Sequence, residues 1–182
     1  KNLENMEWGN VSLIGFNAFE DCGFKELSLP ASLCDIYMNA FAYCKNLVKV
    51  DLSKTNVKEI GCFANCYALE EVRFPQNLTG IGYECFKGCS SIVTLNLPSS
   101  LLTLSGKDFL GMSSLTEIDL SNTKIKGISD ACFKDCSSLQ KVVFPKSLES
   151  INNSAFENAT ALKQVDLSNT TVHNISDRKS VV

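Results

Sequence analysis

Residues 60–78 read IGCFANCYALEEVRFPQNL, and variants of this stretch recur along the whole chain. Its central phenylalanine has counterparts at intervals of 22 to 24 residues: Phe19, Phe41, Phe63, Phe86, Phe109, Phe133 and Phe156. A period of this length that fills a chain is typical of a stacked repeat protein, in which each unit buries its apolar side against its neighbours. The sequence therefore predicts a repeat solenoid rather than a globular domain built around a pocket.

The units share the pattern I-x-x-x-A/C-F-x-x-C-x-x-L-x-x-V-x-L. Its end alternates apolar and polar residues, as in VKVDL at residues 48–52, which indicates a short, half-buried strand. We expect one such strand per repeat, stacked in parallel about 4.8 Å apart. The A-F-x-x-C segment is too short for a long helix and is predicted to form a turn or a single helical turn, with Phe and Cys pointing inward.

This pattern resembles the BspA-type (Treponema pallidum-type) class of bacterial leucine-rich repeats, and the resemblance covers residues 1–176. It implies a leucine-rich repeat solenoid wound as a right-handed curved superhelix. It also implies a secreted or surface-attached bacterial protein that engages host or neighbouring-cell molecules. A fold by itself does not specify an activity, so the function has to be argued from the surface.

The repeat frame predicts a single domain over residues 1–182, with about 7.5 repeats and a C-terminal tail at 177–182. The opening residues align with the second half of a unit, so the chain starts mid-repeat, either as a fragment of a longer array or with a natural half-unit cap. No signal peptide and no apolar run of the ~18 residues needed to span a membrane is visible. A net charge of −3 argues against nucleic acid as a partner.

Two kinds of connection follow the strands. Four units carry Pro30, Pro75, Pro98 and Pro145, whereas three units read D-L-S-x-T from Asp51, Asp119 and Asp166. Proline fixes φ and makes a compact exit, while Ser and Thr can close a turn through bonds to their own backbone. We expect these to be two structural solutions to the same corner.

The nine cysteines fit the repeat core better than a metal site or a disulfide framework. At fixed positions of the repeat Cys exchanges with Ala and Met, which indicates small buried apolar sites. Three C-x-x-x-C pairs could suggest a zinc site, but structural zinc sites prefer C-x-x-C spacing with a second such pair or with histidine. Cys34 lies in a connection and is the thiol that we expect to be exposed.

The outward strand positions form two rows whose chemistry changes from unit to unit. The first row is Asn5, Glu26, Lys49, Glu71, Thr94, Glu117, Lys141 and Gln164, and the second is Glu7, Ser28, Asp51, Arg73, Asn96, Asp119, Val143 and Asp166. These rows are either a solubilising face or a variable ligand surface, and a turn role could explain three of the Asp residues. The predicted partner-binding residues are Lys49, Asp51, Glu71, Arg73, Asn96, Glu117, Asp119 and Lys141. Arg73 is the preferred anchor, because its planar donors can grip a carboxylate in two places.

No catalytic constellation is predicted, and neither is a metal or other cofactor. The only histidine, His173, occupies a position held by Lys in other units. Glu117 and Asp119 would face the same side of a strand roughly 7 Å apart, a glycosidase-like separation, but the pattern implies no cleft around them.

These observations favour a non-enzymatic binding or adhesion module that presents its stacked strands to a protein, or to a glycan. The predicted location is secreted or at the cell surface. The alternative is an intracellular scaffold that uses the same repeat surface, which the cysteine-rich composition also fits.

Overall fold

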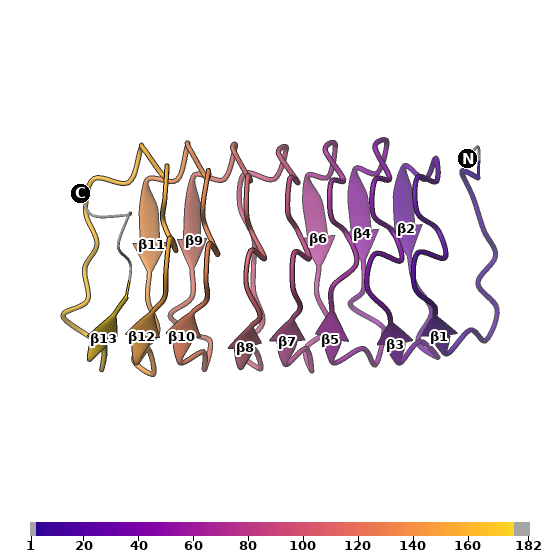
Figure 1. Cartoon of the computed structure of the whole chain (residues 1–182). Helices are drawn as coiled ribbons and strands as arrows, with labels where there is room; N and C mark the ends of the chain where they lie inside the picture. The colour runs from indigo at the N-terminus through magenta and orange to yellow at the C-terminus, as the bar shows by residue number, and fades with distance from the viewer. Residues whose placement is uncertain (1–2, 177–182) are drawn as a thin grey trace.

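The computed structural model describes residues 3–176 as a parallel β-solenoid of about seven turns, without a helix in that range. The first and the last described repeats lie at opposite ends of the stack (Figure 1). The repeat solenoid predicted from the phenylalanine period is therefore confirmed. The predicted C-terminal tail at 177–182 lies outside the described residues.

The predicted strand in the V-x-L part of the repeat forms one ladder, which we call the main ladder. Its members are β2 (Glu26–Ser28), β4 (Lys49–Asp51), β6 (Glu71–Arg73), β9 (Glu117–Asp119) and β11 (Lys141–Val143). Equivalent residues of neighbouring repeats pair in parallel, so that Lys49 lies beside both Glu26 and Glu71. The ladder consists of two sheets, β2-β4-β6 and β9-β11, because the intervening segment 94–96 is not a strand.

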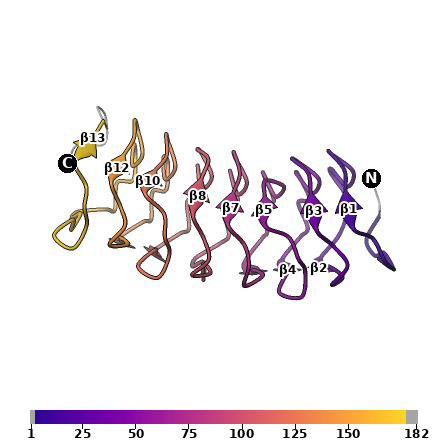
Figure 2. The same ribbon diagram turned by 90° about the horizontal axis from the view of Figure 1, so that it is seen from below.

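A second ladder runs along the other side of the solenoid and was not predicted (Figures 1 and 2). Its members are β1 (Leu13–Ile14), β3 (Asp35–Ile36), β5 (Glu59–Ile60), β7 (Gly80–Ile81), β8 (Thr103–Leu104), β10 (Gly127–Ile128), β12 (Ser150–Ile151) and β13 (Asn174–Ile175). The expectation of one strand per repeat was therefore incomplete. Strands of two residues are too short to show an alternating sequence pattern, and only the register with neighbouring repeats creates them.

The repeated phenylalanines form a column through the core. Successive rings from Phe19 to Phe156 stack nearly parallel, with centroids 5.2 to 6.2 Å apart. Phe41, Phe63, Phe86, Phe109 and Phe133 have no exposed surface. The prediction that one Phe fills each layer is confirmed.

Eight of the nine cysteines are buried, none of the nine is in a disulfide, and Cys34 is exposed, as predicted. The cysteines that lie three positions after the Phe also bond to the neighbouring repeat, because their thiols point at the backbone of the preceding repeat. Cys66 Sγ lies 3.2 Å from the carbonyl oxygen of Phe41, and Cys89 Sγ lies 3.1 Å from that of Phe63. Each thiol donates a weak hydrogen bond that ties one layer to the next.

The segment around each Phe forms turns rather than a helical turn. The residue two positions after every repeated Phe has a positive φ, at Asp21, Tyr43, Asn65, Gly88, Gly111, Asp135 and Asn158. Gly, Asn and Asp adopt this conformation most readily, and they fill six of the seven positions. Tyr43 is the exception, with φ of 60°.

The two kinds of corner are alternative solutions to one turn. In the Pro units the N–H of Leu33 donates to the carbonyl of Pro30 over 3.0 Å, and in the D-L-S-x-T units the N–H of Thr55 donates to that of Leu52 over 2.9 Å. The Thr55 hydroxyl donates to the same Leu52 carbonyl over 2.8 Å. This bond satisfies a hydroxyl that would otherwise be buried without a partner.

Candidate interaction surface

The first and third residues of the main-ladder strands form two rows of side chains on the outside of the solenoid, interrupted at segment 94–96. We call this surface the main strand face. In β2, β4, β6, β9 and β11 the central residue points into the core and its two neighbours point outward. Seven of the eight predicted partner-binding residues lie on these strands. They carry chemically different groups on a repeating backbone, so the face combines a regular scaffold with a varied surface.

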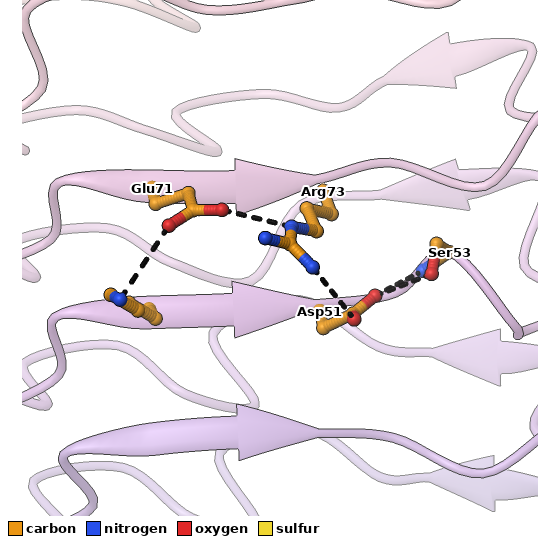
Figure 3. A network of polar contacts seen from close by, with 5 residues as sticks. Asp51, Ser53, Glu71 and Arg73 are labelled. Atoms are coloured by element: carbon orange, nitrogen blue, oxygen red, sulfur yellow. Dashed lines mark hydrogen bonds and ion pairs between the residues drawn. The ribbon is translucent and has the colours of Figure 1, made fainter.

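The N-terminal part of this face carries a network of ion pairs (Figure 3). Arg73 Nε lies 2.8 Å from Glu71 Oε1, and Arg73 Nη1 lies 3.9 Å from Asp51 Oδ2. Lys49 Nζ lies 3.8 Å from Glu71 Oε2. The structure thus brings together four of the predicted residues: Lys49, Asp51, Glu71 and Arg73.

This network leaves its members able to exchange partners. The Arg73 side chain remains 64% exposed, and exposed ion pairs contribute only about 0–1 kcal/mol each. A shallow depression of about 270 Å³ lies over the network and the adjoining strand β2. A partner's charged group can therefore compete for Arg73 or Glu71 at small energetic cost.

The aspartates of the D-L-S-x-T units close turns. Asp51 Oδ1 accepts hydrogen bonds from the Ser53 N–H at 2.9 Å and the Ser53 hydroxyl at 2.6 Å. Asp119 Oδ1 accepts from the Ser121 N–H at 2.8 Å. Hydrogen bonds from Ser53 and Ser121 hold the pKa of Asp51 and of Asp119 below the usual range for Asp. The serine side chains have the largest effect, followed by the serine backbone N–H groups. The turn role that the sequence left open for these residues is therefore present in the structure.

The remaining predicted residues do not join the network. Glu117 and Lys141 are register partners on β9 and β11, and Asp119 lies at the end of β9. Asn96 lies in the segment between the two sheets, where the expected strand is not formed. The strand expected in every repeat is therefore missing from the fourth.

The charge of the main strand face is unbalanced. Its five main-ladder strands carry outward five carboxylates and three cations, counting Glu26, Lys49, Asp51, Glu71, Arg73, Glu117, Asp119 and Lys141. Within residues 3–176, Glu26 and Glu117 form no ion pair. Unpaired carboxylates on one face attract a partner with a positive surface.

Comparison with known proteins identifies the family. A model of the BspA-type leucine-rich repeat region matches six copies, over residues 1–61 and 59–178. The chain belongs to the BspA-type leucine-rich repeat family. Proteins with curated functions gave no match to the sequence.

Solved structures similar to this BspA-type chain share its fold. A leucine-rich repeat protein of T. pallidum is 21% identical, with a TM-score of 0.62 over 77% of this chain and 78% of that one. A protein from Bacteroides ovatus is 25% identical with a TM-score of 0.55, over 91% of this chain and 58% of that one. A protein from Eubacterium ventriosum is 18% identical with a TM-score of 0.51, over 100% and 66%. The chain thus spans less than two thirds of the length of the latter two.

Family membership supports a binding role at a coarse level, because leucine-rich repeats generally mediate protein binding. No group of three metal-ligating side chains occurs in the part of the chain that the structure describes. Residues 3–176 also contain no helix that is long and apolar enough to cross a membrane.

Asp108 is a residue that the sequence reasoning missed in this BspA-type array. It lies directly before Phe109, at the position of Ala40, Cys62 and Cys85 in other repeats, and it has no exposed surface. Its Oδ2 accepts the Gly106 N–H at 3.0 Å, while Oδ1 has no partner. Burial raises the pKa of Asp108 to about 7. Aligning the repeats reveals this charged residue in a core position, although not its unpaired oxygen.

Proposed function

We propose that this protein is a non-enzymatic binding module that presents its main strand face to a protein partner. The observation that carries the proposal is the row of exposed, chemically varied side chains on a backbone that repeats in register from β2 to β6 and again from β9 to β11. Such an array holds its outward groups at fixed spacing, so little conformational entropy is lost when a partner binds.

The partner is a protein whose surface patch is mainly basic and also offers a carboxylate to Arg73. Glu26 and Glu117 offer unpaired carboxylates, and Glu71 is held by Arg73 and Lys49 in an exposed network. Electrostatic attraction of this kind accelerates association and weakens with added salt. The proposed setting is the bacterial surface or the extracellular space, where the module adheres to a host or neighbouring-cell protein.

The test is a binding screen of the purified chain against immobilised matrix proteins, such as fibronectin, fibrinogen, laminin and collagen. Against a ligand found in this way, Arg73→Ala is expected to weaken binding by about 1–3 kcal/mol if Arg73 is a central contact. The thermal melting profile should not change, because the Arg73 ion pairs are exposed. Affinity should also decline as sodium chloride is raised from 50 to 500 mM.

The matched control is Lys134→Ala. Lys134 belongs to the Phe–Cys turn and pairs with Glu157 at 3.2 Å, away from the main ladder. Its loss should leave affinity unchanged. Stronger weakening by Lys134→Ala than by Arg73→Ala would place the binding site on the turns and would refute the assignment to the main strand face.

A second candidate is an intracellular scaffold that uses the same face. The observation in its favour is the set of nine cysteines without a disulfide, which suits a reducing compartment. Protease treatment of intact cells of the source organism separates the two: digestion of the protein favours the surface module, and protection favours the scaffold.

A further inference from the structure

A groove lies on the second ladder, on a different side of the solenoid from the main strand face. It spans β3, β5 and the connection into β7, and its volume is about 640 Å³. Sites that hold small molecules are typically of this size. Its side chains include Asp35, Tyr37, Asn56, Lys58, Glu59 and Asn77.

The groove follows an interruption of the second ladder. β1 pairs with β3 and β5 pairs with β7, but β3 and β5 are not paired. Between β5 and β7 the Gly82 N–H donates to the Ile60 carbonyl at 2.6 Å, whereas no equivalent bond joins the Gly61 N–H to the Ile36 carbonyl. The Ile36 carbonyl beside the groove therefore lacks the bond that its counterparts receive from the next repeat.

Asn56 and Thr79 of the groove bond to backbone carbonyls, but four other polar side chains that line it do not. Within residues 3–176, Asp35, Lys58, Glu59 and Asn77 make no side-chain hydrogen bond or ion pair. Together they offer two carboxylate acceptors, an ammonium donor and an amide that both donates and accepts. Such a mixture is suited to hydroxyl groups, each of which donates and accepts at once.

Tyr37 forms an aromatic wall of the groove. It is the only large side chain in a column of small residues that follow the inward Ile or Leu, and its neighbours there are Gly15 and Gly61. The ring is 40% exposed, and Phe16 packs against it with centroids 4.7 Å apart. A supported ring with open space beside it can lie against the C–H groups of a sugar ring, whose partial positive charge the aromatic face attracts.

The third repeat keeps this space open. Two residues separate Ile60 from Phe63, whereas four separate Ile36 from Phe41 and Ile81 from Phe86. The turn that carries Tyr37 and Met38 in the second repeat is thus shortened in the next one. Gly61 and Gly82 then approach closely, since a Cβ on Gly61 would lie 3.7 Å from the Gly82 Cα.

We propose that this groove binds a short neutral oligosaccharide, with Tyr37 against a sugar ring and with Asp35, Glu59 and Asn77 bonding to its hydroxyls. A free anion is disfavoured, because two carboxylates and one ammonium line the groove. The site is independent of the main strand face and does not rest on the function proposed above.

The experiment titrates the intact chain with maltohexaose, cellohexaose, xylohexaose, mannohexaose and chitohexaose, each to 10 mM, and follows backbone amide shifts by NMR. At least one sugar should shift the amides of Gly61 and Glu59, and Tyr37→Ala should reduce its affinity at least tenfold. Tyr67→Ala is the matched control, because Tyr67 is equally exposed but follows Cys66 on the turn. Arg73→Ala should also leave sugar binding intact.

Three outcomes would overturn the proposal: no shift with any of the five sugars, equal losses for Tyr37→Ala and Tyr67→Ala, or shifts of the groove amides with a tryptic digest of casein but not with sugars. The last result would assign the groove to peptides. Thermal melts of each variant establish that it is folded, which the exposure of both tyrosines leads us to expect.

Discussion

Asp108 shows how one side chain can change the behaviour of a uniform core. Its position holds Ala or Cys in the other repeats, and its buried carboxyl group has one oxygen without a partner. The carbonyl of Asp108 still accepts the Phe86 N–H at 2.8 Å, as its counterparts do in other layers. The backbone hydrogen bond between these two layers is therefore kept with Asp at this position. Burial disfavours only the ionised form of the Asp108 side chain.

We expect Asp108 to make stability depend on pH. Its pKa is raised from 3.8 to about 7 by burial, so between these values the folded chain keeps a proton that the unfolded chain has lost. Stability from this residue is therefore fully present below pH 4 and declines by about 1.4 kcal/mol per pH unit until pH 7. Asp108→Asn removes the ionisation and should gain stability relative to the native chain as pH rises through this window.

Urea unfolding of both proteins from pH 4 to pH 8 measures this difference directly. Asp35→Asn, which removes an exposed carboxylate, is the control. A difference in unfolding free energy between Asp108→Asn and the native chain that stays constant with pH would contradict the buried-carboxyl account.

The thiols should react in two groups. A thiol reagent is expected to modify Cys34 quickly and the other eight cysteines only after denaturation, because Cys34 alone is exposed. Burial also raises the pKa of Cys89 and of Cys136 to about 12, which removes the reactive thiolate at neutral pH. Intact-mass detection of three or more disulfides in the native protein would refute this expectation.

At the scale of the structural element, the corner after the main strand is built in two ways that have different consequences for mutagenesis. A Pro corner is fixed by its ring, whereas a D-L-S-x-T corner depends on a side-chain bond such as that from the Ser121 N–H to Asp119. Removing an aspartate from the main strand face therefore alters both charge and turn. The two effects have to be separated before any binding result is interpreted.

Asp119→Ala is expected to destabilise the protein by about 0.5–1 kcal/mol, as is usual for loss of a side-chain bond to an otherwise unpaired backbone N–H. Asp119→Asn keeps an acceptor oxygen and should be close to neutral. Denaturant melts measure both values. Equal destabilisation by the two variants would mean that the charge of Asp119, rather than its bond to Ser121, supports the turn.

At the scale of the whole molecule, the phenylalanine column makes stability a sum over neighbouring layers. Phe86 stacks between Phe63 at 5.9 Å and Phe109 at 6.2 Å, and Phe74 meets it edge-on at 6.0 Å. Phe156 is the last ring of the column; it stacks on Phe133 at 5.5 Å and meets Phe144 edge-on at 6.3 Å. Removing a ring should therefore matter more in the middle of the array than near its end.

Phe86→Ala is expected to cost about 3–5 kcal/mol, the usual loss for a fully buried Phe. Phe156→Ala should cost less, because Phe156 is the last ring of the column and is 8% exposed, whereas Phe86 has no exposed surface. Urea melts of the two variants compare them. Equal losses at both positions would contradict a nearest-neighbour stack.

The features that repeat could be predicted without a structure. The phenylalanine period, the buried Cys positions, the strand in the V-x-L segment and the two corner types depend on contacts that every layer makes with the next. Such contacts require the same residue type at the same position of each unit, so these features can be recognised from the sequence alone. The eight candidate residues of the main strand face were also placed on the outside by this alternation alone.

How those residues interact could not be predicted from the repeat pattern and is visible only in the folded array. The pairing of Arg73 with both Glu71 and Asp51, the missing strand at 94–96 and the groove beside Tyr37 each depend on which side chain or backbone group lies in the adjacent repeat. The second ladder has the same origin, since two-residue strands exist only through their neighbours. A repeat pattern specifies what all layers share, whereas these features come from differences between two adjoining layers, which appear only when the layers are brought into register.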